Sequence, residues 1–422
     1  GLYLLNGAIS HTGYTLHIRA EAGSGLRPIL QPAVDELGAS GYHFYYGGSL
    51  ILEGLFIQGT NELGAIDNRQ IDISGNENRI VIDDCFFDYS NQVFLRFSSS
   101  NNKIFITNSI FRNSIRPENP NNGRIIDLRG NPQDTIIIEK STIHNCIAEL
   151  VRADNGFIKF YRFNHNTLFQ CCIGGYKLNL NKILKAEVTN NLFYNFSVRG
   201  DLHTHDAFFN VDSIYTVGEY TDADRYFKLN NNNFYTQKEF GDTLEMYCPP
   251  KILYRFDPAD VNHTDTIWYK FGVKTYVFAN KTILDTATTP PPTLIKFIKA
   301  GQADTTNVFS EQLEFKNPPP LGMNYWKFLV QTGFNPGSNT PPTDAYIDED
   351  KNVLGEVTTG AYDFGYNTGS KSATAADDGL PLGDPRWTLF TPVSSKTIDE
   401  NPNSVKTYPN PFSNTITFEI ES

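Results

Sequence analysis

Apolar and polar residues alternate in short runs along the first two-thirds of the chain. Runs such as 79–83 (RIVID) and 135–139 (TIIIE) are rich in Ile and Val, which is typical of β-strands. A second short alternating run follows each of them, as at 94–97 and 126–128. No segment carries a sustained apolar stripe with the 3.6-residue period of a helix. The pattern therefore predicts a β protein.

A four-residue cadence recurs between these paired strands. Its last residue is usually aromatic, and the seven copies end at Phe56, Phe87, Phe111, Ile143, Phe169, Phe193 and Phe234. The copies are 24 to 41 residues apart, which indicates loops of varying length on a fixed unit. Repeats of this size without helices stack into a solenoid with one continuous core. We therefore expect an all-β fold, a right-handed parallel β-helix.

The first position of the cadence is often asparagine. The four copies with this residue carry Asn108, Asn166, Asn190 and Asn231. Asparagine tolerates a left-handed φ and bonds to neighbouring backbone, so it suits a bend between strands. We interpret these residues as a structural ladder. The aromatic anchors Phe87, Phe111, Phe169 and Phe193 are expected to stack in the interior.

Two of the five cysteines fall at equivalent places on adjacent repeats. Cys146 and Cys172 each follow their anchor by three residues. Neighbouring parallel strands lie about 4.8 Å apart, a separation that a disulfide accepts. A bridge and a pair of stacked, buried thiols are both open. No cysteine or histidine spacing indicates a zinc site.

The cadence loosens after residue 240, although 275–286 resembles an eighth coil, with Asn280 three places before Ile283. From residue 287 onward the chain is rich in proline, which excludes central strands. The predicted organisation is a parallel β-helix over 1–286, then a region over 287–398 that wraps or caps it. A linker and terminal segment complete the chain at 399–422.

The net charge and the hydropathy of the chain limit the classes of partner that it can bind. The formal charge of −12 argues against nucleic acid or a membrane surface as the partner. No stretch approaches eighteen uninterrupted apolar residues, so no membrane span is expected. The sequence starts at Gly1 without Met or a signal peptide, and we expect an N-terminal portion to be missing or processed.

The segment SATAADDGLPLGDPRW, residues 372–387, carries a resemblance. Together with the Asn-rich repeats, it is similar to secreted and surface β-helix proteins of Bacteroidota, in the pectate-lyase-like group that ends in PLGDPRW. The similarity covers roughly residues 10–390. It implies a right-handed parallel β-helix and association with polysaccharide, often pectin-like, without implying catalysis.

A second resemblance lies in VKTYPNPFSNTITFEI, residues 405–420. It is similar to the start of the C-terminal sorting domain that the type IX secretion machinery of Bacteroidota reads. That domain normally has further strands, so it is truncated in a chain that ends at Ser422. The resemblance implies export across the outer membrane, and therefore a secreted or cell-surface protein.

Outward residues of successive parallel strands form columns. A catalytic or binding site would therefore be built from residues of several coils. Aligning the second strands predicts one column of Asp72, Arg96, Asp127, Arg152, Lys177 and Asn210. The next column contains Ser74, Ser98, Arg129, Asp154, Asn179 and Asp212. With rungs about 4.8 Å apart, the charged residues in the middle of both columns come within the reach of one sugar unit.

This set fits a lyase that acts on a uronate. Such an enzyme neutralises the substrate carboxylate and removes the proton at the adjacent carbon with a base of depressed pKa. We assign Lys177, Arg152 and Arg129 to catalysis, with Lys177 as the base. The substrate-binding residues are then Arg96, Asp127, Asp154 and Asn179. A Ca²⁺ cofactor stays open, because Asp127 and Asp154 offer few of the oxygen ligands it needs. The alternative is a ladder of alternating charges that keeps the sheet soluble and in register.

Three other groups carry weaker signals. His203 and His205 could hold a metal, but no third ligand is evident, which favours a surface loop. The Asp83–Asp84 pair falls at a bend and lacks the signature of a galacturonide hydrolase. In GYHFYYGG, residues 41–48, either Tyr42, Phe44 and Tyr46 or His43 and Tyr45 face outward, where rings could stack on sugars; an aromatic-filled first coil is the alternative.

The expected function is binding or processing of polysaccharide at the cell surface, with lyase action on an acidic glycan as its enzymatic form. The alternative is a structural or adhesive extracellular protein, a stalk or fibre unit whose partner is a further copy of itself.

Overall fold

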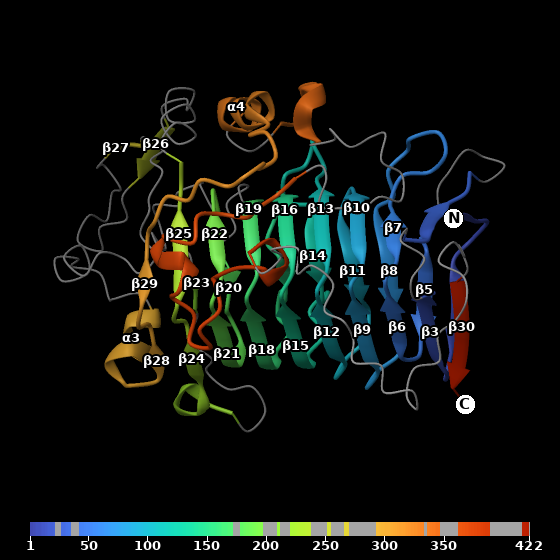
Figure 1. Cartoon of the computed structure of the whole chain (residues 1–422), viewed down its shortest axis with the longest axis horizontal. Coiled ribbons are helices and arrows are strands. Elements are labelled where there is room, and N and C mark those ends of the chain that lie inside the picture. The colour runs from blue at the N-terminus through green and yellow to red at the C-terminus, as the bar shows by residue number, and fades with distance from the viewer. Residues whose placement is uncertain are drawn as a thin grey trace.

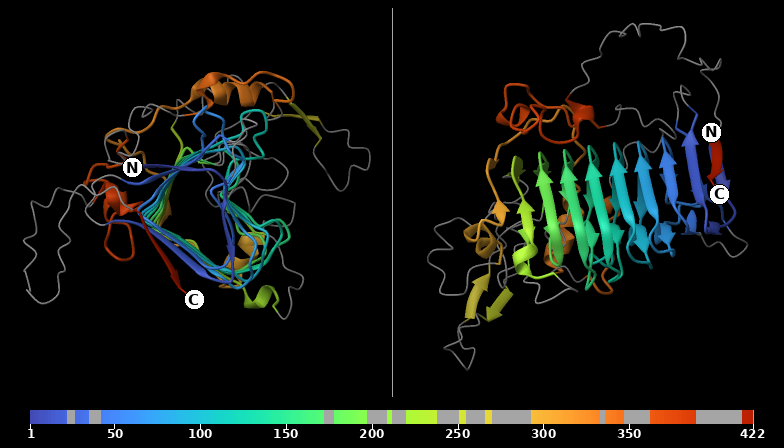
Figure 2. Two further views of the ribbon diagram at one scale, coloured as in Figure 1. Left: turned by 90° about the vertical axis from the view of Figure 1, so that its right-hand side faces the viewer. Right: turned by 90° about the horizontal axis from the view of Figure 1, so that it is seen from below.

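The computed structural model describes residues 1–21, 27–34, 42–171, 178–196, 209–211, 220–237, 251–254, 266–269, 293–332, 336–346, 362–388 and 416–421. Within them the chain is a right-handed parallel β-helix, as predicted (Figure 1). The coils contribute strands to three parallel sheets, here called A, B and C, and successive coils stack along one axis. The view down that axis shows a roughly triangular cross-section (Figure 2).

Sheet A contains the anchor positions. Its strands are β1 (Leu2–Leu5), β4 (Ile29–Pro32), β7 (Phe56–Gln58), β10 (Phe86–Ser90), β13 (Ile110–Ser114), β16 (Thr142–Cys146), β19 (Thr167–Cys171), β22 (Leu192–Tyr194), β25 (Asn232–Tyr235) and β29 (Val308–Phe309).

Sheet B contains the second short strands of the repeats. They are β2 (Ile9–Thr12), β5 (Phe44–Gly47), β8 (Arg69–Ile73), β11 (Val93–Phe97), β14 (Arg124–Asp127) and β17 (Val151–Arg152). The paired strands β20 (Leu178–Asn179) and β23 (Phe209–Asn210) follow, with β20 beside β17.

Sheet C precedes each bend. Its parallel strands are β3 (Thr15–Ala20), β6 (Leu50–Glu53), β9 (Arg79–Asp83), β12 (Lys103–Thr107), β15 (Gln133–Glu139), β18 (Ile158–Asn164), β21 (Ile183–Thr189), β24 (Tyr226–Lys228) and β28 (Ala303–Asp304). At the N-terminal edge, β30 (Ile416–Glu421) pairs antiparallel with β3. A separate antiparallel pair joins β26 (Lys251–Tyr254) to β27 (Thr266–Tyr269).

Inward residues of all three sheets stack in columns to form one core. In sheet C, for example, Ile82, Ile106, Ile138 and Phe163 lie in register on successive strands and are fully buried. In sheet A the rings of Phe87 and Phe111 stack with centroids 4.8 Å apart. Because each strand alternates inward and outward residues, this stacking also places outward residues in columns.

The bend between sheets C and A explains the recurring first position of the cadence. The residue at this bend adopts a left-handed φ angle of 48° to 69°. The bend residues are Gly54, Asp84, Asn108, Lys140, His165, Asn190 and Asn231. The next residue in each coil forms the ladder. The Oδ1 atom of Asn191 accepts from the backbone N–H of Asn166 at 2.8 Å, and Asn232 accepts from Asn191 at 3.0 Å. The predicted ladder exists one residue further along than expected.

Two of the predicted anchor positions are one residue away from the residue that points inward in the structure. Ile143 pairs with Leu168, so Leu168 points inward, and Phe169 packs outside sheet A against Tyr194. Asn166 accordingly belongs to the ladder, while His165 takes the left-handed φ. Phe56 is likewise on the outside, because it pairs with Phe86 rather than Phe87. The cadence alone cannot resolve a one-residue shift when both candidate positions are apolar, although such a shift reverses the face of the sheet.

The cysteine register differs by one residue for the same reason. Cys146 lies opposite Cys171, not Cys172. Both are buried, and the thiol of Cys171 donates to the carbonyl of Ile143 at 3.2 Å, as expected for the stacked-thiol alternative. Cys172 lies outside the described residues.

The C-terminal end of the solenoid is completed by later residues than predicted. β28 and β29 pair with β24 and β25, and Asn307 between them has a left-handed φ of 52°. These rungs occupy the place expected for 275–286, which lies outside the described residues. Helix α3 (Thr293–Lys299) packs Phe297 against Phe227 at the end of the core and so caps it (Figure 1).

The rest of the C-terminal region wraps around the outside, as expected. Residues 362–388, here called the strap, cover the outer surface of sheet A through Phe364, Leu382 and Trp387. Helix α4 (Met323–Gln331) packs Trp326 on the residues that follow β13 and β16. No helix within the described ranges has the length and apolar character needed to cross a membrane.

The PLGDPRW segment is the anchor of the strap. Asp384 is 2% exposed, and its carboxylate accepts from the hydroxyl of Thr142 at 2.8 Å and from the backbone N–H of Arg386 at 3.0 Å, with the Arg386 guanidinium 2.9 Å away as an ion pair. The indole N–H of Trp387 donates to the same hydroxyl at 2.7 Å. Gly383 has a φ of 85°, and a Cβ there would come within 2.6 Å of Thr167. The segment therefore has a structural role at this point of the fold.

Candidate functional site

The outer surface of sheet B carries the predicted charged column. The register places Asp72 opposite Arg96, Arg96 opposite Asp127, and Asp127 opposite Arg152. Inward neighbours such as Ile71 and Leu95 are fully buried, which turns the charged residues outward. The residues of this surface, here called the charged face, are Asp72, Ser74, Arg96, Ser98, Asp127, Arg129, Arg152 and Asp154, with Arg69, Arg124 and Glu149 at its margin.

Arg152 interacts with two neighbouring carboxylates of the charged face. Its Nε lies 2.7 Å from Asp154, and its terminal nitrogen lies 3.6 Å from Asp127. The carboxylate of Asp127 also accepts the backbone N–H of Arg129 at 3.1 Å. Asp127 is 5% exposed, so its charge is compensated inside the protein. The structure thus brings together Arg152 and Asp154, two of the residues predicted to lie within the reach of one sugar unit, and the predicted substrate-binding residue Asp127.

Arg96 has the most unusual surroundings on this face. Its side chain is half-buried, and its Nε donates no hydrogen bond within the described residues. Its pKa is lowered by burial and by the nearby cations Arg69 and Arg129, against the opposing effect of Asp72 and Asp127. A guanidinium in this position retains its charge and its capacity to donate.

Arg129 is the exposed cation next to it. Its guanidinium makes no hydrogen bond or ion pair with the part of the chain that the structure describes. Arg129 and Arg96 therefore offer donors toward solvent from adjacent columns, as the sequence predicted.

Two residues that sequence reasoning missed belong to this face. Arg69 lies 3.1 Å from Asp72, and its guanidinium covers the ring of Tyr42 at 4.3 Å from the centroid. Glu149 is 7% exposed, and burial raises its pKa despite a hydrogen bond from Asn179 and the proximity of Arg124 and Arg152. Both precede the outward column by three residues, and this common offset was the available signal.

The continuation of the column differs from the prediction. Asn179 lies opposite Asn210, whereas the sequence alignment had paired Lys177 with Asn210 and Asn179 with Asp212. The aligned positions are therefore wrong by two residues at this coil, because the connection after β19 has a different length. Lys177 and Asp212 lie outside the described residues, so the predicted base and its catalytic role stay predictions.

The aromatic run after residue 41 is also sorted by the structure. Phe44 and Tyr46 fill the core, and His43 is fully buried. Tyr45 is 44% exposed and lies opposite Asp72 in the charged column. One outward ring therefore continues the charged face toward the N-terminus.

No cluster of three or more His, Cys, Asp or Glu side chains suited to a metal ion occurs among the described residues. On the charged face, Asp127 and Asp154 both interact with Arg152, so arginine occupies the place that a Ca²⁺ ion would need. These two carboxylates do not fit a calcium site. His203 and His205 lie outside the described residues.

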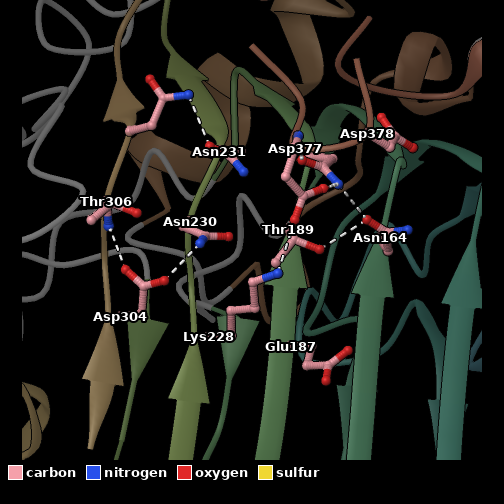
Figure 3. Close-up of polar contacts among 12 residues, drawn as sticks. Asn164, Glu187, Thr189, Lys228, Asn230, Asn231, Asp304, Thr306, Asp377 and Asp378 are labelled. Carbon is pink, nitrogen blue, oxygen red and sulfur yellow. Dashed lines mark hydrogen bonds and ion pairs between the residues drawn. The ribbon is translucent and has the colours of Figure 1, made fainter. Parts of the chain in front are cut away.

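A second group of polar residues lies where the strap crosses the bend between sheets C and A (Figure 3). Lys228 Nζ is 2.9 Å from Asp377, which also accepts from Asn190 at 2.8 Å. The Lys228 ammonium lowers the pKa of Asp377, and Asp377 raises that of Lys228. Because these polar groups bond to one another across the strap, we interpret the group as a structural clasp.

The Asp83–Asp84 pair is structural as well. Asp84 has a left-handed φ of 49° at the bend and pairs with Arg27. Asp83 accepts from Thr107 and Asn108 on the next coil. Both residues lie at the junction of sheets C and A, away from the charged face of sheet B, because Asp83 ends strand β9 and Asp84 forms the bend that follows it.

The charged face has an excess of positive charge, whereas the net charge of the whole chain is negative. It combines five arginines (Arg69, Arg96, Arg124, Arg129 and Arg152) with four carboxylates (Asp72, Asp127, Asp154 and Glu149). The chain as a whole carries −12. A local excess of cations on an acidic protein can attract an anionic ligand of extended shape.

The fold defines the class of protein as a parallel β-helix. Comparison of the chain with protein-family models, curated proteins and solved structures finds no match. The similarity to Bacteroidota surface proteins therefore stays a prediction from the sequence.

Proposed function

We propose that this protein binds acidic polysaccharide along the charged face. The observation that carries the proposal is the arrangement of Arg96 and Arg129, which present donors from adjacent columns beside Arg69. A uronate carboxylate or a sulfate accepts two parallel hydrogen bonds from a guanidinium, which a neutral sugar cannot do. The carboxylates Asp72 and Asp127 are already engaged with arginines, so their repulsion of such a ligand is reduced.

The shape of the face supports an extended ligand. Columns of outward residues run along the solenoid axis with a rung about every 4.8 Å. A linear glycan that lies along this axis would meet arginine donors on several successive coils, at Arg96, Arg129 and Arg152. The half-buried position of Arg96 strengthens a charge-assisted bond, because less water competes for the guanidinium.

The test is binding of purified protein to polygalacturonate, alginate and chondroitin sulfate, with dextran as the neutral glycan, by isothermal titration calorimetry. We expect affinity for at least one acidic glycan and none for dextran. Arg96→Gln and Arg129→Gln should each weaken binding roughly tenfold, since a hydrogen bond to a charged group contributes about 1.5 kcal/mol or more. Raising the salt from 0.05 M to 0.5 M should weaken it further.

A matched control is Arg79→Gln. Arg79 is exposed on sheet C, where its guanidinium lies over the ring of Phe105 at 5.2 Å. This variant removes the same charge from another face and should bind like the wild type. Equal losses in Arg79→Gln and Arg96→Gln would mean that net charge, not the charged face, governs binding.

Lyase action is the enzymatic extension of this proposal. It requires a base beside the arginines, and Lys177 is the residue that the sequence offers. Incubation with each acidic glycan while absorbance at 232 nm is followed would report unsaturated product. A rising signal that Lys177→Ala and Arg152→Ala abolish would support catalysis, whereas binding without product would restrict the function to recognition.

The two resemblances support an extracellular setting. We propose that the protein is secreted or held at the cell surface, with the type IX secretion machinery as its export partner. The alternative function, a stalk or fibre unit, predicts self-assembly. Light scattering that shows concentration-dependent growth, together with no binding to any acidic glycan, would favour that alternative.

A further inference from the structure

The charged face ends in a pair of tyrosines at its N-terminal side. Tyr45 lies opposite Asp72, two rungs before Arg96, and is 44% exposed. Its neighbours Phe44 and Tyr46 are buried in the core, so the alternation of strand β5 holds the ring of Tyr45 outward. An exposed ring in the same column as the charged residues extends the face by an apolar surface.

Tyr42 is joined to this ring and to the charged residues. The ring centroids of Tyr42 and Tyr45 are 6.4 Å apart at an angle of 39°. The guanidinium of Arg69 lies 4.3 Å from the centroid of Tyr42, and its Nε lies 3.1 Å from Asp72. A continuous series of contacts therefore runs from Tyr45 through Tyr42 and Arg69 to Asp72. Such contacts restrict the rings, so less conformational entropy is lost when a ligand packs on them.

From this geometry we infer that Tyr42 and Tyr45 form a stacking subsite for a pyranose ring of the acidic glycan. The inference rests on the proposed function and adds the direction of the ligand. Tyrosine combines an apolar ring face with a polar hydroxyl, which suits a sugar whose C–H groups and hydroxyls alternate around the ring. The glycan would extend along the axis from Tyr45 toward Arg129 and Arg152.

The distance along the axis makes the inference specific. Two rungs separate β5 from β11 in sheet B, and three separate β5 from β14, so Tyr45 lies roughly 10 Å along the axis from Arg96 and roughly 14 Å from the rung that precedes Arg129, at about 4.8 Å a rung. A dimer whose two carboxylates are held by Arg96 and Arg129 cannot reach the tyrosines, whereas a longer oligomer contacts both. The tyrosines should therefore contribute only to the binding of long chains.

The experiment measures binding of galacturonate dimers and of octamers by isothermal titration calorimetry. Tyr45→Ala is expected to weaken octamer binding about fivefold to tenfold and to leave dimer binding unchanged. Tyr45→Phe, which keeps the ring, should retain most of the octamer affinity. Arg129→Gln should weaken both ligands, because the arginines hold the part of the chain that both share.

The matched control is Tyr226→Ala. Tyr226 is 43% exposed on strand β24 of sheet C, away from the charged face, and its loss should affect neither ligand. Unchanged octamer binding by Tyr45→Ala, or an equal loss in Tyr226→Ala, would overturn the subsite while leaving acidic-glycan binding in place. Absence of binding by the wild-type protein to either oligomer or to any acidic polymer would overturn the proposed function and the subsite together.

Discussion

A single left-handed residue turns each coil from sheet C into sheet A. At this position the chain uses glycine, aspartate, asparagine, lysine or histidine, all with φ between 48° and 69°. Asparagine is favoured there because its short amide stabilises the left-handed conformation locally. The neighbouring ladder residues have a different role, since their side chains bond to the backbone of the preceding coil and hold adjacent coils in register.

Asn191→Ala tests the ladder. Asn191 is fully buried, accepts the backbone N–H of Asn166 at 2.8 Å, and donates to the carbonyl of Phe163 at 2.9 Å. Alanine would leave both groups unsatisfied in the core, at a cost of about 3 kcal/mol. Urea unfolding followed by circular dichroism should show that loss. The control Asn155→Ala, at an exposed position, should change the free energy of unfolding by less than about 0.5 kcal/mol, and similar losses in both variants would contradict a special role for the ladder.

At the scale of elements, the strap converts the outer surface of sheet A into a second core. Apolar residues there, such as Phe86 and Leu192, point away from the solenoid interior and are buried only because the strap and residues 309–315 cover them. The outward charges of sheet A, Asp88 and Arg112, are correspondingly buried and form an ion pair at 2.6 Å. The coverage leaves the charged face on a different side of the solenoid from the strap's anchors.

Asp384→Ala tests the anchor of the strap. The substitution removes the acceptor for Thr142 and Arg386 at a buried site. We expect local opening of the strap to become easier by about 2 kcal/mol, or roughly thirtyfold. Limited trypsin digestion after Lys371 should accelerate accordingly, while far-ultraviolet circular dichroism stays that of a β-helix.

The comparison variant for the strap is Asp378→Ala. Asp378 is 45% exposed and pairs with His165 at 2.9 Å. Although His165 is buried, solvent screens the carboxylate of Asp378, so the contact contributes little and digestion should be close to that of the wild type. Slower digestion of Asp384→Ala than of Asp378→Ala would show that the PLGDPRW segment is not the anchor.

At the scale of the whole molecule, the closed core excludes charge, and this affects its response to acid. His43 and His144 are buried, and burial is the main cause that lowers both pKa values, that of His43 to about 4. In the unfolded chain a histidine titrates near 6.5. Between these values the unfolded chain binds more protons, so stability is present above pH 6.5 and is lost as the pH falls toward 4. Glu149 and Asp384 have the opposite effect on stability. Burial raises their pKa values, so as the pH falls the folded state binds protons at a higher pH than the unfolded chain does.

His43→Gln tests the histidine contribution. The wild-type protein should lose about 2 kcal/mol through His43 when the pH falls from 7.5 to 5. The variant, although less stable at pH 7.5 through lost packing, should show a difference between the two pH values that is smaller by that amount. Urea unfolding at both pH values measures it, and His11→Gln, at an exposed position, serves as the control. An unchanged pH difference in His43→Gln would contradict the assignment.

The sequence by itself determined the class of fold, the position of the bends and the column from Asp72 to Arg152. Strand alternation with a repeating bend is a local property, and stacking of identical units carries it to the whole molecule without further information. Register was the part that local pattern could not decide at every coil. Phe169 and Leu168 are both apolar, and only the packing of Leu168 between Ile143 and Phe193 selects which of the two faces inward.

The tertiary structure alone decided which residues surround the charged column. Arg69 and Glu149 share an offset of three residues before the outward column, but only the folded chain shows that their side chains reach the face, and Tyr42 joins it through its contact with Arg69. It likewise decided that sheet A is covered, since the strap meets residues more than 200 positions away through contacts such as Asp384 to Thr142. Burial, and with it the altered pKa of Arg96 or His43, depends on such long-range packing, which a linear pattern does not contain.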